Sequence, residues 1–98
     1  PANTLVDAQA ANELQPAAYY LRMELQDKPG ALAKIATLLG EHGISIDRMR
    51  QYNHEMSTAP VLIVTHKTTK DALTSALDGF GATGVVATPP VAIRIEEV

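Results

Sequence analysis

The sequence predicts a small α+β domain in which four strands and two helices follow the order strand, helix, strand, strand, helix, strand. Two patterns carry this prediction. Apolar residues alternate with polar ones in three segments, as in half-buried strands, and a continuous apolar run marks a fourth strand. In two other segments they recur at i, i+3, i+4 and i+7, the stripe of an amphipathic helix. This order is typical of the ferredoxin-like βαββαβ arrangement, a four-stranded antiparallel sheet with two helices on one face.

The first strand and the first helix are joined by a short turn. Four alternating apolar residues predict the strand: Tyr19, Leu21, Met23 and Leu25. The turn Asp-Lys-Pro-Gly at 27–30 breaks it, and Pro29 suits a first helical position because its missing N–H costs nothing there. The helix stripe that follows comprises Leu32, Ile35, Ala36 and Leu39. Gly43 is expected to end this helix in the left-handed conformation.

The middle of the chain predicts two strands. The second strand is expected from Ile44 to about Tyr52, with a bulge near Asp47 where the alternation slips. Residues 53–59 are expected to form a loop. The apolar run at 61–64 fits a central strand, so the second strand would lie at an unpaired edge, which invites another chain.

The last part of the chain predicts a helix and a strand. Thr68 or Thr69 is expected to cap the helix, whose stripe comprises Leu73, Ala76, Leu77 and Phe80. Alternating residues after Pro89-Pro90 predict the final strand: Val91, Ile93 and Ile95. In this arrangement Arg94 and Glu96 would share a solvated sheet face with Arg22 and Glu24.

Composition argues against several classes of function. The chain has 98 residues and no Cys, so disulfides and thiolate metal sites are excluded. Its three His residues, at 42, 54 and 66, share no ligand spacing, so no metal site is expected. A net charge of −3 argues against nucleic acid as a partner. No membrane contact is expected, since no apolar run approaches the ~20 residues that cross a bilayer. No secretory signal is visible, and the expected location is the cytoplasm.

The fold alone decides no function, because several functions use it. RNA binding would need aromatic side chains on the open sheet face, where only Tyr20 is expected. A hydrolase of the acylphosphatase type would need an anion-holding Arg beside a Gly-rich loop after the first strand. Asp27 and Lys28 stand there instead, with no paired nucleophile and base. No catalytic residue is therefore expected in this chain.

Small-molecule binding at the turn is a third possibility. A helix that begins directly after a strand leaves its first N–H groups without partners, here those of Gly30, Ala31 and Leu32. Together with the helix dipole they suit an anion such as the carboxylate of an amino acid. Asp27 could accept the ammonium group of the same ligand. The alternative interpretation is that Asp27 only caps the helix and Gly30 only turns the chain.

Residues 19–97 resemble an ACT domain, the amino-acid-sensing module of metabolic enzymes. The resemblance rests on the Asp-x-Pro-Gly-x-Leu turn at 27–32 and on Gly-Ile-Ser-Ile at 43–46. Three further segments are similar to the C-terminal regulatory domain of bacterial homoserine dehydrogenases: Tyr-Tyr-Leu-Arg at 19–22, Val-Thr-His at 64–66 and Pro-Val-Ala-Ile-Arg-Ile-Glu at 90–96. The resemblance implies a linker or the tail of a preceding domain at 1–18, and an ACT regulatory domain at 19–98.

The resemblance also implies a binding site shared between paired domains. It assigns effector contacts to six residues: Asp27, Gly30, Ala31, Leu32, Ser45 and Ile46. The last two would face the site from the same chain or from a partner chain. Many relatives have Asn in place of Ser45, whose side chain is shorter and has only one donor. The expected assembly is a homo-oligomer formed through the edge strand.

The function that the resemblance implies is feedback control of an enzyme of threonine and methionine biosynthesis, with threonine as the favoured effector. The fragment would contain no cofactor, and NAD(P) would belong to the rest of the parent enzyme. Two alternatives stay open. The domain could hold an oligomer together without binding a ligand. It could also be an ACT domain of another enzyme, such as a dehydrogenase of serine synthesis, or a free-standing sensor.

Overall fold

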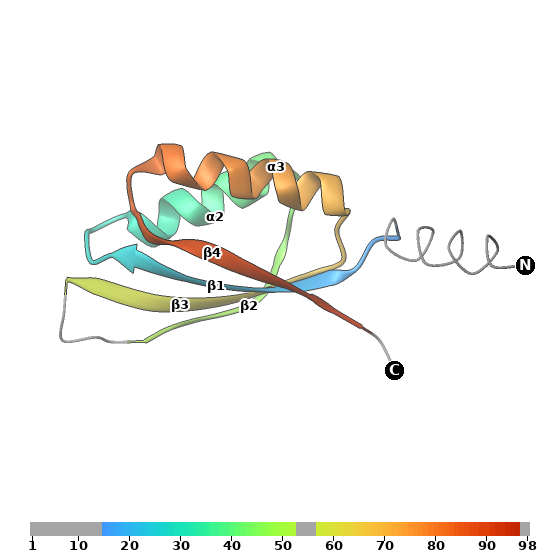
Figure 1. The fold of residues 1–98 in the computed structure, drawn as a ribbon, viewed down its shortest axis with the longest axis horizontal. Helices are drawn as coiled ribbons and strands as arrows, with labels where there is room; N and C mark the ends of the chain where they lie inside the picture. Colours follow the sequence, from blue (N-terminus) through green and yellow to red (C-terminus); the bar gives the residue numbers. More distant parts are fainter. Residues whose placement is uncertain (1–14, 53–56, 97–98) are drawn as a thin grey trace, which may run out of the picture.

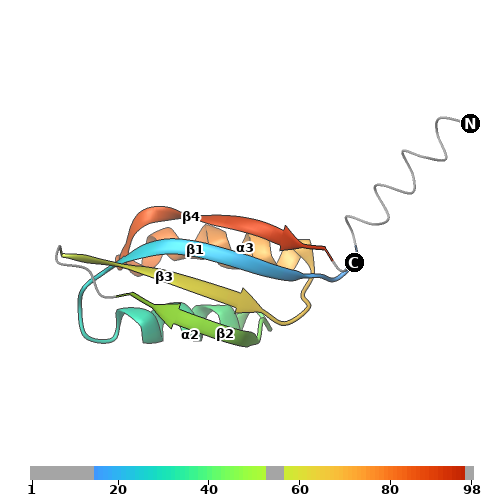
Figure 2. The ribbon, with the colours of Figure 1, turned by 90° about the horizontal axis from the view of Figure 1, so that it is seen from below.

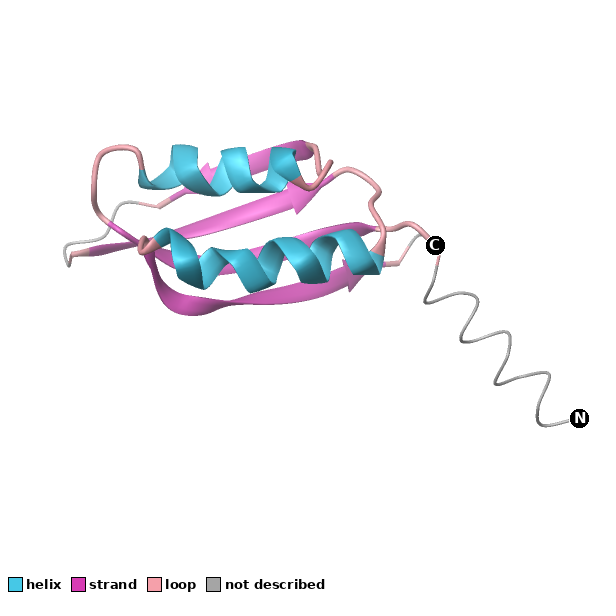
Figure 3. Ribbon diagram, turned by 90° about the horizontal axis from the view of Figure 1, so that it is seen from above, coloured by secondary structure: helices cyan, strands magenta, loops and turns pink. Residues whose placement is uncertain are grey.

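The computed structural model describes residues 15–52 and 57–96 of the chain, and it contains the predicted order of elements. These are β1 (Ala18–Gln26), α2 (Ala31–Glu41), β2 (Ile46–Gln51), β3 (Thr58–Thr65), α3 (Lys70–Phe80), the 3₁₀ turn η1 (Gly81–Thr83) and β4 (Val86–Ile95). The strands form one antiparallel sheet in the order β2-β3-β1-β4. Both helices lie on one face of this sheet, and no described element covers the other face (Figures 1 and 3). The ferredoxin-like α+β fold is confirmed.

The core lies between the sheet and the two helices. The four alternating residues predicted to be buried in β1 are at most 6% exposed: Tyr19, Leu21, Met23 and Leu25. α2 contributes Ala31, Ile35 and Leu39, and α3 contributes Leu73, Ala76 and Phe80. The helices approach closely at Gly79, where a Cβ would lie 3.3 Å from the side chain of Leu38. Both helix stripes thus pack as their periodicity predicts.

Gly43 and Thr69 end and begin the helices as predicted, but the start of α2 differs from the prediction. Pro29 was expected at the first helical position, whereas α2 begins at Ala31 and Gly30 is its N-cap with φ 81°. Gly43 follows the C-cap of α2 with φ 73°. Both values lie in the left-handed region that favours glycine. At the start of α3, the Thr69 hydroxyl accepts a hydrogen bond from the Ala72 N–H at 3.1 Å. Of the two caps considered for α3, Thr69 is therefore the one used.

The edge strand β2 contains the predicted bulge. Its register against β3 shifts between Ile46 and Arg48, which restores the alternation at Met49. The strand begins at Ile46, two residues later than expected. β3 begins at Thr58, inside the loop predicted at 53–59, and residues 53–56 lie outside the described part of the chain.

The pairing of β4 differs from the prediction. Arg22 pairs with Val91 and Tyr20 pairs with Ile93, whereas Arg94 pairs with the buried Tyr19. The expected open face with Arg94 and Glu96 beside Arg22 and Glu24 is therefore wrong. The two register shifts around Pro89-Pro90 do not cause this, because each reverses the alternation and together they restore it. Val86 pairs with the buried Leu25, so strict alternation along β4 already places Ile93 on the opposite face.

The ordered domain includes residues before Tyr19. Ala17 is 6% exposed and exchanges two backbone hydrogen bonds of 2.9 Å with Thr68. β1 itself begins at Ala18. Residues 1–14 of the predicted linker lie outside the described residues.

One buried polar side chain links the two central strands. The Thr65 hydroxyl, on a residue 1% exposed, accepts a hydrogen bond of 3.0 Å from the Tyr19 N–H. Replacing Thr65→Val keeps the shape but leaves that buried N–H without an acceptor. We expect the free energy of unfolding to fall by roughly 1–3 kcal/mol, measured by urea denaturation. Thr88→Val removes an exposed hydroxyl that donates to Glu24. This control should change the free energy of unfolding far less. Equal losses in the two variants would contradict this role of Thr65.

Candidate functional site

The turn at 27–30 is held by backbone hydrogen bonds on both sides. The Gln26 N–H donates to the Val85 carbonyl at 2.7 Å, and the Asp27 N–H donates to the Ser57 carbonyl at 2.8 Å. The end of β1 is thereby fixed between the segments that follow η1 and precede β3. The chain can then turn sharply at Gly30 and enter α2 at Ala31.

Three backbone amides at this turn were predicted to point outward, and one of them does not. The Ala31 N–H donates to the Lys28 carbonyl at 3.2 Å, so it is used to close the turn. The Gly30 carbonyl accepts from the Lys34 N–H at 3.0 Å. Among the described residues, the N–H groups of Gly30 and Leu32 have no hydrogen-bond partner. These two amides and the positive end of the α2 dipole can hold an anion.

The side chain of Asp27 does not cap α2. The N-cap position belongs to Gly30, and no side chain accepts a hydrogen bond there. Asp27 is exposed and has no ion-pair or hydrogen-bond partner for its carboxylate among the described residues. The turn therefore combines a carboxylate with two unpartnered amides, which complement the ammonium and carboxylate groups of an amino acid.

β2 begins at the end of the sheet opposite to the turn (Figure 2), and Ser45 and Ile46 lie at its start. Ile46 pairs with Thr65, while Gln26, just before the turn, pairs with Thr58. Those two partners are seven residues apart along β3, which corresponds to about 23 Å. Ser45 is exposed, and its carbonyl accepts from the His66 N–H at 2.9 Å. A single chain therefore does not bring Ser45 and Ile46 to the turn.

The C-terminal end of β2, at Gln51, is the end that lies toward the turn. Gln51 pairs with Val61, and the Tyr52 N–H donates to the Pro60 carbonyl at 2.9 Å. β2 is one of the two edge strands of the sheet, with β4 at the other edge, and all its residues after Ile46 are exposed. Its free edge runs from the Ser45 end of the domain to the turn end.

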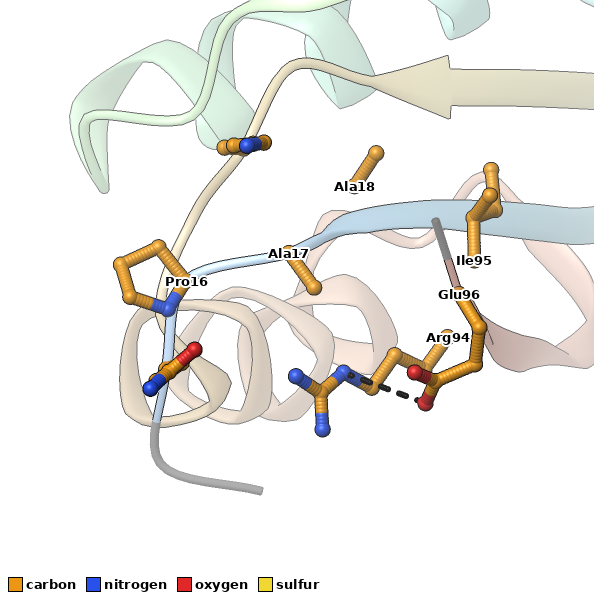
Figure 4. A pocket seen from close by; sticks show the side chains of 8 residues that line it. Pro16, Ala17, Ala18, Arg94, Ile95 and Glu96 are labelled. Carbon is orange, nitrogen blue, oxygen red and sulfur yellow. Dashed lines mark ion pairs between the residues drawn. The ribbon is translucent and has the colours of Figure 1, made fainter. Parts of the chain in front are cut away.

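A separate hollow of about 220 Å³ lies between the start of β1 and the end of β4 (Figure 4). Its charged lining residues are Lys67, Arg94 and Glu96, with 3.7 Å between Arg94 Nε and a Glu96 carboxylate oxygen. It contains none of the predicted site residues. It adjoins Gln15 and Glu96, the first and last of the described residues. The turn, rather than this hollow, is the candidate site.

The described residues offer no metal centre. Within 15–52 and 57–96, no group of three or more His, Cys, Asp or Glu side chains could hold a metal ion. His42 is the C-cap of α2, and His66 lies 3.8 Å from Asp47. His54 is outside the described residues. In the same ranges, neither helix is long and apolar enough to cross a membrane.

Residues 19–79 match the family model of the ACT domain. The chain belongs to the ACT domain family. It is also similar to homoserine dehydrogenases. That of Pseudomonas aeruginosa is 37% identical over 83 residues, which are 83% of this chain and 19% of that protein. That of Corynebacterium glutamicum is 33% identical over 78 residues, 80% of this chain and 17% of that protein.

Solved structures agree with this assignment. A homoserine dehydrogenase from Thiobacillus denitrificans has a TM-score of 0.75 and 33% identity, over 87% of this chain and 19% of that one. The ACT domain from GTP pyrophosphokinase of Chlorobium tepidum has a TM-score of 0.62 and 18% identity, over 82% of this chain and 99% of that one. The second similarity shows the fold alone. The chain spans about a fifth of the length of the curated relatives it matches.

Two residues that hold the turn were not predicted from the sequence. Ser57 and Val85 act through their carbonyl groups, so their side chains give no signal in the sequence. Only the antiparallel arrangement places them on either side of the end of β1.

Gly30 and Gly40 allow the backbone requirement of the turn to be tested. At both positions an added Cβ would meet no atom within 4 Å, but only Gly30 has a positive φ. Gly30→Ala should lower the free energy of unfolding by about 1–2 kcal/mol through backbone strain. Gly40→Ala lies inside α2 and should raise it by about 0.5–1 kcal/mol. Urea denaturation of both variants measures this, and changes of the same sign would contradict the argument.

Proposed function

We propose that this chain is the amino-acid-binding regulatory domain of a homoserine dehydrogenase, and that threonine is its effector. The observation that supports the parent enzyme is the similarity of about four-fifths of the chain to proteins of that one name. The observation that supports ligand binding is the turn, where the unpartnered amides of Gly30 and Leu32 adjoin the exposed carboxylate of Asp27.

The parent enzyme would reduce aspartate semialdehyde to homoserine with NAD(P)H, on the route to threonine and methionine. The described residues form a single ACT fold, so the nucleotide and the catalytic groups would belong to the remaining four-fifths of such an enzyme. Threonine is an end product of that route, and its binding here would lower the activity of the parent. Coupling between two such sites is typically 1–3 kcal/mol. A biosynthetic enzyme that uses NAD(P)H would work in the cytoplasm.

In this proposal the turn holds the main-chain groups of the ligand. The carboxylate accepts hydrogen bonds from the Gly30 and Leu32 N–H groups at the start of α2. The ammonium group donates to the Asp27 carboxylate in a charge-assisted hydrogen bond. The space beside the Gly30 Cα is open, so a ligand can approach the backbone there.

Pairing of two chains along β2 would complete the site. A two-fold axis through the middle of β2 would make the two strands antiparallel, so the Ser45 end of one meets the Gln51 end of its partner. Ser45 and Ile46 of the partner would then lie beside the turn.

Calorimetric titration of the chain with threonine tests the proposal. We expect saturable binding, and Asp27→Asn should weaken it about tenfold because the charge partner of the ammonium group is lost. Asp71→Asn, in the first turn of α3, is the matched control and should leave affinity unchanged. Binding that is equally strong in the wild type and Asp27→Asn would place the ligand elsewhere.

The rival function is a structural module that pairs chains without a ligand. It is favoured by the exposed, unpaired edge of β2, which suffices for association. Sedimentation run beside the titration separates the two. A stable dimer that binds none of threonine, serine, methionine, lysine or isoleucine supports the structural role. Saturable binding of serine in place of threonine would instead point to an ACT domain of another enzyme.

A further inference from the structure

The open face of the sheet is apolar where a solvated face was expected. Val91, Ile93 and Ile95 of β4 are 54%, 55% and 38% exposed. Their register places them beside Arg22, Tyr20 and Ala18, on the side of the sheet away from the helices. Leu62 and Val64 of β3 continue the same surface across the sheet. We call these apolar residues and Tyr20 the open-face patch.

The charged residues around the open-face patch have the character of a protein interface. All three cations on this face are arginines, Arg22, Arg48 and Arg50, whereas every Lys of the chain lies in a helix or a loop. Tyr52 packs under Arg50, with 4.7 Å from Arg50 Cζ to the ring centre. Interfaces are enriched in Arg, Tyr and Met and depleted of Lys, unlike ordinary solvated surface.

The face also carries both signs of charge. Arg48 lies 3.9 Å from Asp47, and Glu24 accepts a hydrogen bond from the Thr88 hydroxyl at 3.0 Å. Two shallow hollows break the surface. One of about 340 Å³ is lined by Tyr20, Met49, Leu62 and Val64 together with Arg48 and Arg50, and one of about 320 Å³ lies beside Pro60 and Val91. The surface is therefore uneven enough to accept side chains from a partner.

The width of the face decides which kind of partner fits. Four strands spaced about 4.8 Å apart make a surface about 19 Å wide. A single helix, about 10 Å in diameter, would leave roughly half of it in water. A twisted sheet of equal width would cover all of it, in the aligned packing that β-sandwiches use.

We propose that this face packs against the same face of a second copy of the chain, sheet on sheet. Eight residues along each strand give a footprint of roughly 500 Å² per copy, about 1,000 Å² in total, at the lower limit of specific interfaces. The expected association is therefore weak. The surface is distinct from the free edge of β2, so both contacts can form together and produce a four-chain assembly. The inference does not rest on amino-acid binding.

Sedimentation of the full 98-residue chain tests this inference. Between about 10 μM and about 1 mM, the range expected for an interface of this size, the mass of the wild type should double from its value at low concentration. Ile93→Glu places a charge inside the patch and should abolish the doubling. Thr74→Glu, at an exposed position on α3, adds the same charge on the opposite layer and should behave as the wild type.

The remaining outcomes overturn the inference. No doubling by the wild type would mean that a second copy does not cover this face, and that a different partner does so or the face stays in water. Doubling by the chain shortened to 15–98, but not by the full chain, would identify residues 1–14 as the occupant. Val91→Arg is the second variant if Ile93→Glu loses its circular dichroism signal. Doubling by a folded Val91→Arg or Ile93→Glu would place the contact elsewhere.

Discussion

The structure depends on β1, which is paired along both edges and buried along one face. Its alternating side chains are the centre of the core, and β3 and β4 flank it in the sheet. Because side chains alternate strictly along a strand, burial of Tyr19, Leu21, Met23 and Leu25 requires Tyr20, Arg22 and Glu24 to face away from the helices. The same strand ends where Gln26 and Asp27 are hydrogen-bonded on both sides, and this determines where the turn lies.

In the proposed function, the position of the turn explains why one chain would form only part of the site. The first helical N–H groups are at one end of the sheet, and the strand that follows the helix starts at the other. In the proposed dimer, the edge strand would pair with its own copy and join these ends without any change in the fold. In this account, pairing and ligand binding depend on each other, so a ligand that contacts two chains also stabilises their association.

The sequence predicted those features that depend on neighbouring residues. The alternation in β1, both helix stripes, the left-handed Gly43, the Thr69 cap and the bulge after Ile46 are all local, and the structure has each of them. The ferredoxin-like topology followed from their order.

The features that were missed depend on contacts between distant segments. The outward direction of Ile93 follows from its pairing with Tyr20, a register that depends on contacts between β1 and β4. The use of the Ala31 amide within the turn, and the hydrogen bonds to Ser57 and Val85, depend on backbone geometry alone. The separation of Ser45 from the turn depends on the strand order. None of these leaves a pattern in side-chain type.

Titration of a mixture of two defective variants tests the shared site most directly. Asp27→Arg would damage the turn, and Ser45→Trp would obstruct the strand end, so each variant alone should bind no threonine while keeping the wild-type mass. In an equal mixture, half of the dimers would be mixed, and each mixed dimer would contain one intact site. The account predicts that binding returns at about one quarter of the wild-type stoichiometry. No recovery of binding in a mixture that demonstrably exchanges chains would contradict a site built from two copies.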